Sequence, residues 1–208
     1  MADQAVTEKQ DKRRREILRA TLRLLRNHGT GITTAQIAAD AHCSKETLYA
    51  WFGDRDGIFQ ALVEQQSRGM NAALGRQLRR AQGGDLRERL IRSGAALLDI
   101  LTGDAAITVN RLAMAEACRE RAGLGIATLD DWQTQVVTPF LELFDEGVAQ
   151  DQLTIDDPQE VFEVFMGLLL GDRQRRLLLG EDARPHADAM EMIAQEAVER
   201  WLMIFSAR

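Results

Sequence analysis

Apolar residues recur along this chain at the three- to four-residue spacing of amphipathic helices, and no stretch alternates as a strand would. The pattern therefore predicts an all-α protein. The predicted helices cover about residues 11–27, 33–41, 44–52, 54 towards the loop at 83–84, 85–101, 105–121, 128–150, 158–179 and 185–205. Pro139 lies inside the 128–150 helix and is predicted to kink it.

Two short predicted helices between Ile32 and Phe59 are joined by a tight corner. Thr33 is a good N-cap, and Gln36 three residues on completes a capping box. Ser44 is predicted to begin the second helix. His42 lies in the corner, where positive φ is common and histidine is one of the enriched non-glycine types. An exposed turn histidine with an ordinary backbone is the alternative interpretation.

This spacing of two helices around a corner predicts a helix-turn-helix whose second helix can enter the major groove of DNA. Leu48 and Phe52, four residues apart, form an inward stripe and leave the other positions outward. Tyr49 and Thr47 are the residues we expect to contact bases. The full set of candidate DNA contacts is Thr33, Thr34, Ser44, Lys45, Glu46, Thr47, Tyr49, Ala50, Trp51 and Arg55.

Charge is distributed unevenly along the chain. Residues 1–55 carry ten Lys and Arg against seven Asp and Glu, whereas the whole chain carries 26 against 32, for a net charge of −6. A basic end on an acidic protein is typical of a DNA-binding module joined to a body that does not touch DNA. A solvated charge run without nucleic acid is the alternative for Lys12 to Arg15.

The sequence gives little support for catalysis or metal binding. The three histidines are scattered, and no spacing of Cys and His suits zinc or any other metal, so we expect no cofactor and no enzyme. Two distant cysteines, Cys43 and Cys118, indicate a reducing compartment. Without a secretory signal or a spanning segment, we expect a cytoplasmic protein with no membrane partner. A redox switch at either cysteine stays open, although the Cys43 thiol would need a depressed pKa.

At this point the chain resembles the tetracycline-repressor (TetR) family of transcriptional regulators. The resemblance rests on RRREILRATLRLLRNHG, ITTAQIAADAHCSKETLYAWF and GDRDGIFQALV, which together cover about the first 65 residues. It implies a DNA-binding domain over 1–55 and a helical effector-binding and dimerisation domain over 56–208. The chain departs from the family pattern at Glu46, at His42 in place of glycine, and at Ala50-Trp51, which bears on the operator sequence.

The last two predicted helices are candidates for a homodimer interface. The 158–179 helix is apolar over most of its circumference, and a protein that binds a palindrome needs a two-fold axis. Both helices could instead be core elements of a monomer. The interface candidates are Phe165, Leu168, Gly171, Met190, Ile193, Ala197 and Trp201.

The middle of the chain could enclose a pocket for a small effector. Trp132, Phe140 and Phe144 recur on one face of the helix that contains Pro139, although plain core packing explains the same pattern. The effector-contact candidates are Asn110, Arg111, Met114, Trp132, Phe140, Phe144 and Phe162. The resemblance implies a repressor that a small, largely apolar molecule releases from DNA; control by a protein partner or by cysteine oxidation is the alternative.

Overall fold

The computed structural model describes residues 2–80, 83–117 and 132–207. Its described residues form two compact units, one of residues 2–66 with 108–117 and one of residues 67–107 with 132–207. The predicted break at residues 123–125, the predicted helix start at 128 and Cys118 lie outside the described residues. The described residues contain helices and no strand, so the all-α prediction is confirmed.

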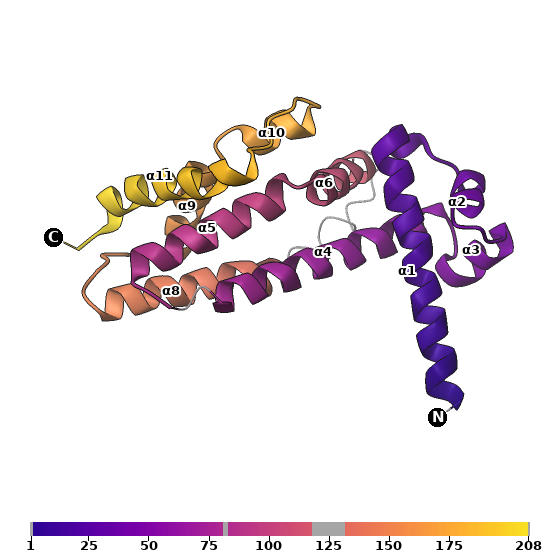
Figure 1. Cartoon of the computed structure of the whole chain (residues 1–208), viewed down its shortest axis with the longest axis horizontal. Helices are drawn as coiled ribbons and strands as arrows, with labels where there is room; N and C mark the ends of the chain where they lie inside the picture. The colour runs from indigo at the N-terminus through magenta and orange to yellow at the C-terminus, as the bar shows by residue number, and fades with distance from the viewer. Residues whose placement is uncertain (1, 81–82, 118–131, 208) are drawn as a thin grey trace. The chain divides into compact units, whose positions relative to one another are not determined.

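The first unit is built from α1 (Ala2–His28), a short 3-10 turn (Gly29–Gly31), α2 (Thr34–Asp40), α3 (Lys45–Phe52), the start of α4 (Arg55–Arg80) and the end of α6 (Asp104–Ala117). In Figure 1, α2 and α3 lie together beside α1. The helix α1 starts well before the expected position near Asp11.

One hydrophobic core holds the first unit together. Ile17 and Leu18 of α1, Ile37 of α2 and Leu48 of α3 are almost completely buried in it. Ile58, Phe59, Leu62 and Val63 of α4 also belong to it, as do Val109 and Leu112 of α6. This compact unit therefore extends beyond the division at residue 55 that we expected from the sequence, because the first turns of α4 bury their apolar face with α1 to α3.

The second unit comprises the rest of α4, α5 (Leu86–Thr102), a π-helical turn (Gln133–Val137), α8 (Thr138–Ala149), α9 (Pro158–Leu170), α10 (Arg173–Leu178) and α11 (Ala187–Phe205). Its core is aromatic. Trp201 of α11 stacks on Phe144 of α8 with ring centroids 4.9 Å apart, and Phe140 meets both Phe162 and Phe165 at 5.4 Å. Helix α5 lies along α11 (Figure 1), where Gly94 allows close approach to Phe165 and Ala194.

Two elements differ from their sequence predictions. The 158–179 helix stops at Leu170, because Gly171 has φ of 53° and closes α9 as its C-cap. Gly171 therefore ends the helix. Pro139 lies in the first turn of α8, directly after the π-helical turn, where a proline that cannot donate a hydrogen bond is tolerated. No described helix combines the length and apolarity that a membrane span requires.

Candidate nucleic-acid interface

The local sequence around α2 and α3 determines where both helices begin. The Thr33 hydroxyl accepts a hydrogen bond from the Gln36 amide at 3.2 Å, and the Gln36 side chain accepts from the Thr33 amide at 2.8 Å. The Ser44 hydroxyl accepts from the Thr47 amide at 3.1 Å. Both predicted caps are confirmed, and they define where the two short helices begin.

Helix α3 has one buried and one exposed face. Leu48 and Phe52 point into the core, whereas Lys45, Glu46, Tyr49 and Ala50 are exposed. Exposed residues at i, i+1, i+4 and i+5 lie on one side of a helix. This side is the surface that α3 can present to a major groove.

Two further candidates on α3 are only half exposed. The Thr47 hydroxyl lies 3.1 Å from the Ser44 hydroxyl and so takes part in the helix cap. Trp51 packs partly against the core of the first unit. The structure thus leaves Tyr49, rather than Thr47, as the more accessible of the two residues that we expected to contact bases.

The start of α2 and the middle of α3 enclose a shallow open depression of about 600 Å³. Thr33, Thr34, Tyr49 and Arg55 are among its lining residues, so the structure brings four predicted DNA contacts together. The Tyr49 hydroxyl lies 3.4 Å from the Thr34 hydroxyl, and almost half of the Tyr49 side chain is exposed. Side-chain hydroxyls in this position can donate hydrogen bonds to phosphate oxygens, although the depression is also lined by Asp54.

The corner between α2 and α3 is a Schellman motif. The His42 amide donates to the Ala39 carbonyl at 3.2 Å, and the Cys43 amide donates to the Ala38 carbonyl at 3.0 Å. His42 has φ of 51°, which confirms the predicted left-handed corner. This position is usually glycine, because a side chain makes the left-handed region costly.

Replacing His42 by glycine is therefore expected to leave the protein equally stable or to stabilise it by up to about 1 kcal/mol. Glycine adopts the required φ without steric cost, and the imidazole is exposed. Denaturant unfolding of His42→Gly and the parent measures the difference. Clear destabilisation would mean that the imidazole makes a stabilising contact that outweighs the steric gain.

Arg55 has a structural role that the sequence did not reveal. Its Nε donates to the Ile32 carbonyl at 3.0 Å, its Nη2 donates to the Thr30 carbonyl, and its guanidinium lies 4.4 Å from the Phe59 ring centroid. The side chain therefore holds the loop that precedes α2. At least two of its donors are engaged inside the domain, and its contact with DNA stays a prediction.

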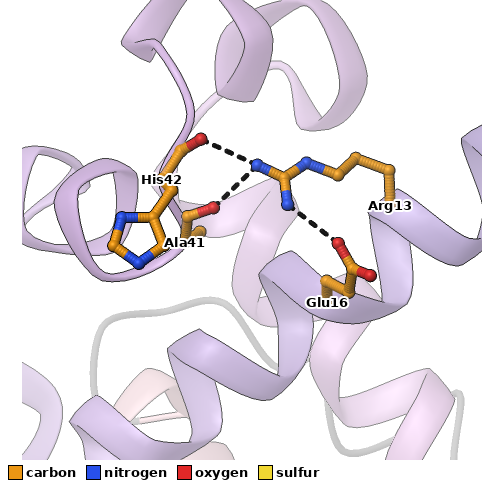
Figure 2. Close-up of polar contacts among 4 residues, drawn as sticks. All are labelled: Arg13, Glu16, Ala41 and His42. Carbon is orange, nitrogen blue, oxygen red and sulfur yellow. Dashed lines mark hydrogen bonds and ion pairs between the residues drawn. The ribbon is translucent and has the colours of Figure 1, made fainter.

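Three arginines of α1 also brace the neighbouring helices. Arg13 contacts the corner carbonyls of Ala41 and His42 (Figure 2), Arg14 lies 4.8 Å from the Phe52 ring centroid, and Arg23 pairs with Asp40 at 2.8 Å. For Lys12 to Arg15 the sequence predicts either part of a DNA-binding module or a solvated charge run. These partners lie in other helices, so no local spacing could have identified them.

The environment of Cys43 does not favour a reactive thiol. Burial raises the pKa of this thiol, and the nearby Arg13 charge only partly opposes the shift. A redox-sensing cysteine needs the opposite shift, because the thiolate is the reactive form. Within the described residues, no group of acidic, histidine or cysteine side chains could hold a metal ion.

The second unit contains a cavity of about 270 Å³ between α4, α5 and α8. Phe140 and Pro139 line it together with several charged groups, among them Arg89, whose Nη1 lies 2.5 Å from a Glu146 carboxylate oxygen. Apolar and charged lining in one small cavity suits a molecule with an apolar body and a polar end.

The other effector candidates lie elsewhere. Phe144 and Phe162 are packed in the core, and Trp132 is half-buried against that core without lining the cavity. Asn110, Arg111 and Met114 are on the part of α6 that belongs to the first unit. Of the predicted set, the cavity therefore contains Phe140 alone.

The predicted interface residues differ in burial. Phe165, Met190, Ala197 and Trp201 are buried within the chain's own core. Leu168 and Ile193 are half-buried, and Gly171 is exposed. The large exposed apolar side chains of α11 are Met192, Met203 and Ile204, which the sequence analysis did not single out.

Comparisons with known proteins agree with this fold. Residues 17–62 match the family described as bacterial regulatory proteins, tetR family, and residues 88–207 match the AefR-like transcriptional repressor, C-terminal domain. Curated protein sequences give no match.

Several solved structures are similar over nearly the whole chain. A TetR transcriptional regulator from Agrobacterium tumefaciens is 31% identical with a TM-score of 0.78, covering 95% of this chain and 96% of its own. A TetR-family regulator from Mesorhizobium loti MAFF303099 is 21% identical with a TM-score of 0.82, covering 95% and 98%. The flavonoid-responsive regulator FrrA is 20% identical with a TM-score of 0.69, covering 95% and 99%.

A capped helix-turn-helix in the first unit, followed by a helical unit with its own core, defines a DNA-binding transcriptional regulator. The chain belongs to the TetR family of these regulators.

Proposed function

We propose that this protein is a repressor that binds a palindromic operator as a homodimer and is released from it by a small effector. The exposed face of α3, formed by Lys45, Glu46, Tyr49 and Ala50, is the observation that carries the proposal. Two such helices, related by a two-fold axis, would enter successive major grooves of one duplex. Their occupation of the operator would block transcription.

Footprinting the purified protein on the DNA that flanks its own gene tests this function. The expected result is a protected site with two half-sites about one helical turn apart, centre to centre. Protection that is uniform along the fragment, or absent at every protein concentration, would contradict operator recognition.

Operator binding is also expected to weaken steeply as salt rises. Lys45 on α3 and the exposed Lys12 and Arg15 on α1 supply about two to three phosphate contacts per subunit. A dimer should then show a slope of about −4 to −5 in a plot of log affinity against log salt concentration. Fluorescence anisotropy with a labelled operator measures the slope, and a value near zero would exclude a phosphate-based interface.

The proposed dimer would use the exposed apolar side chains of α11. Met192, Met203 and Ile204 are well exposed in the single chain, and burying such side chains against a second copy is favourable. Light scattering should give twice the chain mass. Met203→Glu, which places a charge at the most exposed of these positions, should shift the protein towards monomer.

We further propose that the effector occupies the cavity beside Phe140. The cavity is small, and its mixed lining favours a compact aromatic molecule with a polar substituent. The relative described as flavonoid-responsive supports an aromatic effector for this fold. Binding would reduce operator affinity if the effector prefers the form that does not bind DNA by a few kcal/mol.

A matched pair of variants tests the cavity. Phe140→Ala and Phe162→Ala should each destabilise the second unit by about 3–5 kcal/mol, because both rings are buried in the same core. Only Phe140 lines the cavity, so only Phe140→Ala should also change the response to flavonoids and related aromatic compounds. Thermal shift and operator affinity with added compound measure that response, and an equal change in both variants would place the effector elsewhere.

Control by a protein partner is the alternative to a small effector. The raised pKa of Cys43 speaks against oxidation at that residue as the signal. The cavity in the second unit favours the small molecule.

A further inference from the structure

We propose that Arg13 is a positioning residue for DNA recognition. Its guanidinium fixes the corner between α2 and α3, and Glu16 holds the guanidinium in place. Figure 2 shows the arrangement: one nitrogen, Nη2, donates to the carbonyls of Ala41 and His42, each at 2.8 Å, and Nη1 donates to a Glu16 carboxylate oxygen at 2.8 Å. The inference rests on the proposed recognition of DNA by α3.

The corner needs such a partner because a helix end leaves carbonyl groups without intrahelical hydrogen bonds. The Schellman bonds satisfy the carbonyls of Ala38 and Ala39. The carbonyls of Ala41 and His42, in the corner itself, accept from Nη2 of Arg13 instead. A cation at the C-terminal end of α2 is also favoured by the helix dipole.

The Arg13 contact acts at the point where the direction of α3 is determined. Ala41 and His42 stand just before Ser44, the N-cap of α3, and His42 adopts a left-handed conformation that its side chain disfavours. The backbone angles of this corner determine how α3 leaves α2. A base-contacting helix must be held to a fraction of an ångström, which requires support from residues that do not themselves touch the ligand.

Glu16 completes the clamp from within α1. Its carboxylate lies three residues from Arg13 and accepts from the other arm of the guanidinium. The pKa of Glu16 is lowered mainly by this hydrogen bond, so the carboxylate is charged at neutral pH. The ion pair is part-exposed and adds little stability alone; its role is to orient the planar guanidinium towards the corner.

Both terminal nitrogens of the Arg13 guanidinium are already hydrogen-bonded within the protein, which distinguishes this role from a phosphate contact. An arginine that binds a phosphate through its fork would have to release either Glu16 or the corner carbonyls. Arg15, two residues further along α1, is exposed and carries the same charge. It is one of the proposed phosphate contacts, so Arg15→Ala shows what the loss of such a contact does to binding.

The experiment compares Arg13→Ala with Arg15→Ala in the full-length protein. Affinity is measured for the footprinted operator and for a random duplex of equal length, over a series of salt concentrations. Arg13→Ala should weaken operator binding by about tenfold or more, because charge-assisted hydrogen bonds that shape the corner are lost. Its random-duplex affinity should fall less than that of Arg15→Ala, which loses a proposed phosphate contact, and the salt slope for the operator should stay at the parent value.

Equal losses for operator and random duplex in Arg13→Ala, with a salt slope flatter by about one per subunit, would identify a phosphate contact and overturn the proposal. An operator affinity equal to that of the parent would also overturn it. If Arg13→Ala is poorly stable, hydrogen exchange distinguishes a local effect on the corner from a general loss of stability. The amides of His42 and Cys43 should lose protection while those in the middle of α1 keep theirs, whereas equal loss everywhere would mean a general structural role.

Glu16→Ala tests the same proposal by removing a negative charge instead of a positive one. Removing an acidic residue from a surface that faces DNA should raise the affinity for every duplex if only charge matters. The positioning role predicts instead that the ratio of operator affinity to random-duplex affinity falls. A rise in both affinities without a change in their ratio would reject the role of Glu16.

Failure of this inference can be told apart from failure of the proposed function. Tyr49→Ala removes a side chain from the exposed face of α3 and leaves the Arg13 contacts in place. If Tyr49→Ala loses the operator while Arg13→Ala does not, only the positioning role is rejected. If neither variant affects operator binding, recognition by α3 itself is rejected.

Discussion

Tyr49→Ala is expected to remove most of the operator specificity of this regulator while leaving its melting temperature almost unchanged. Almost half of the Tyr49 side chain is exposed, and its hydroxyl has only a long contact with Thr34 at 3.4 Å. A base contact contributes about 1–3 kcal/mol, and a dimer would lose two, so the operator should bind about 2–6 kcal/mol more weakly. Anisotropy titration and calorimetry measure the two quantities.

Two controls locate the cause of that loss. Tyr49→Phe keeps the ring and removes the hydroxyl, so it separates apolar contact from hydrogen bonding. Leu48→Ala changes the neighbouring buried position and should destabilise the first unit by about 2–4 kcal/mol through a cavity. If Tyr49→Ala lowers the melting temperature and leaves operator affinity intact, Tyr49 supports the fold and another part of α3 contacts the bases.

The local parts of the helix-turn-helix could be predicted from the sequence because they depend on residues three or four positions apart. The caps at Thr33 and Ser44 and the positive φ at His42 are of this kind. Each follows from the hydrogen-bonding groups of a short segment, which are present in the sequence itself. The identity of the first unit as a DNA-binding fold could be predicted for the same reason.

The roles of the arginines could not be predicted in the same way. Arg13 contacts residues 28 and 29 positions away, and Arg55 contacts carbonyls 23 and 25 positions away. A run of basic residues near a DNA-binding helix therefore has two physical uses. Some of its members hold the domain together, and the exposed ones remain for phosphates.

The dimer interface could not be predicted for a different reason. The broad apolar stripe of α11 predicts burial but does not indicate whether the chain's own core or a second copy covers it. Met190, Ala197 and Trp201 belong to the core, while Met192 and Met203 lie on the opposite, exposed side. Likewise, aromatic spacing around Phe140 did not indicate which rings would line a cavity, because three of the four predicted rings lie away from it.

Trp201 provides the second large expected effect, and it concerns stability. The side chain is fully buried; its ring stacks on Phe144, meets Phe165 edge-on at 6.2 Å, and its Nε1 donates to the Val161 carbonyl at 3.1 Å. Trp201→Ala should cost about 3–5 kcal/mol, because the loss of the ring leaves a cavity in the middle of the aromatic core. For a chain of this size the melting temperature should fall by about 10 °C.

Trp201→Phe is the matched control, since it keeps an aromatic ring but loses the donor to Val161. It should retain much of the stability, with a remaining loss of about 1–3 kcal/mol from the unpaired carbonyl and the smaller ring. Calorimetry at a fixed protein concentration keeps the contribution of dimerisation constant. If Trp201→Ala instead yields monomers with an unchanged melting temperature, Trp201 stabilises the dimer directly, and the burial that the single chain shows would not describe its role in solution.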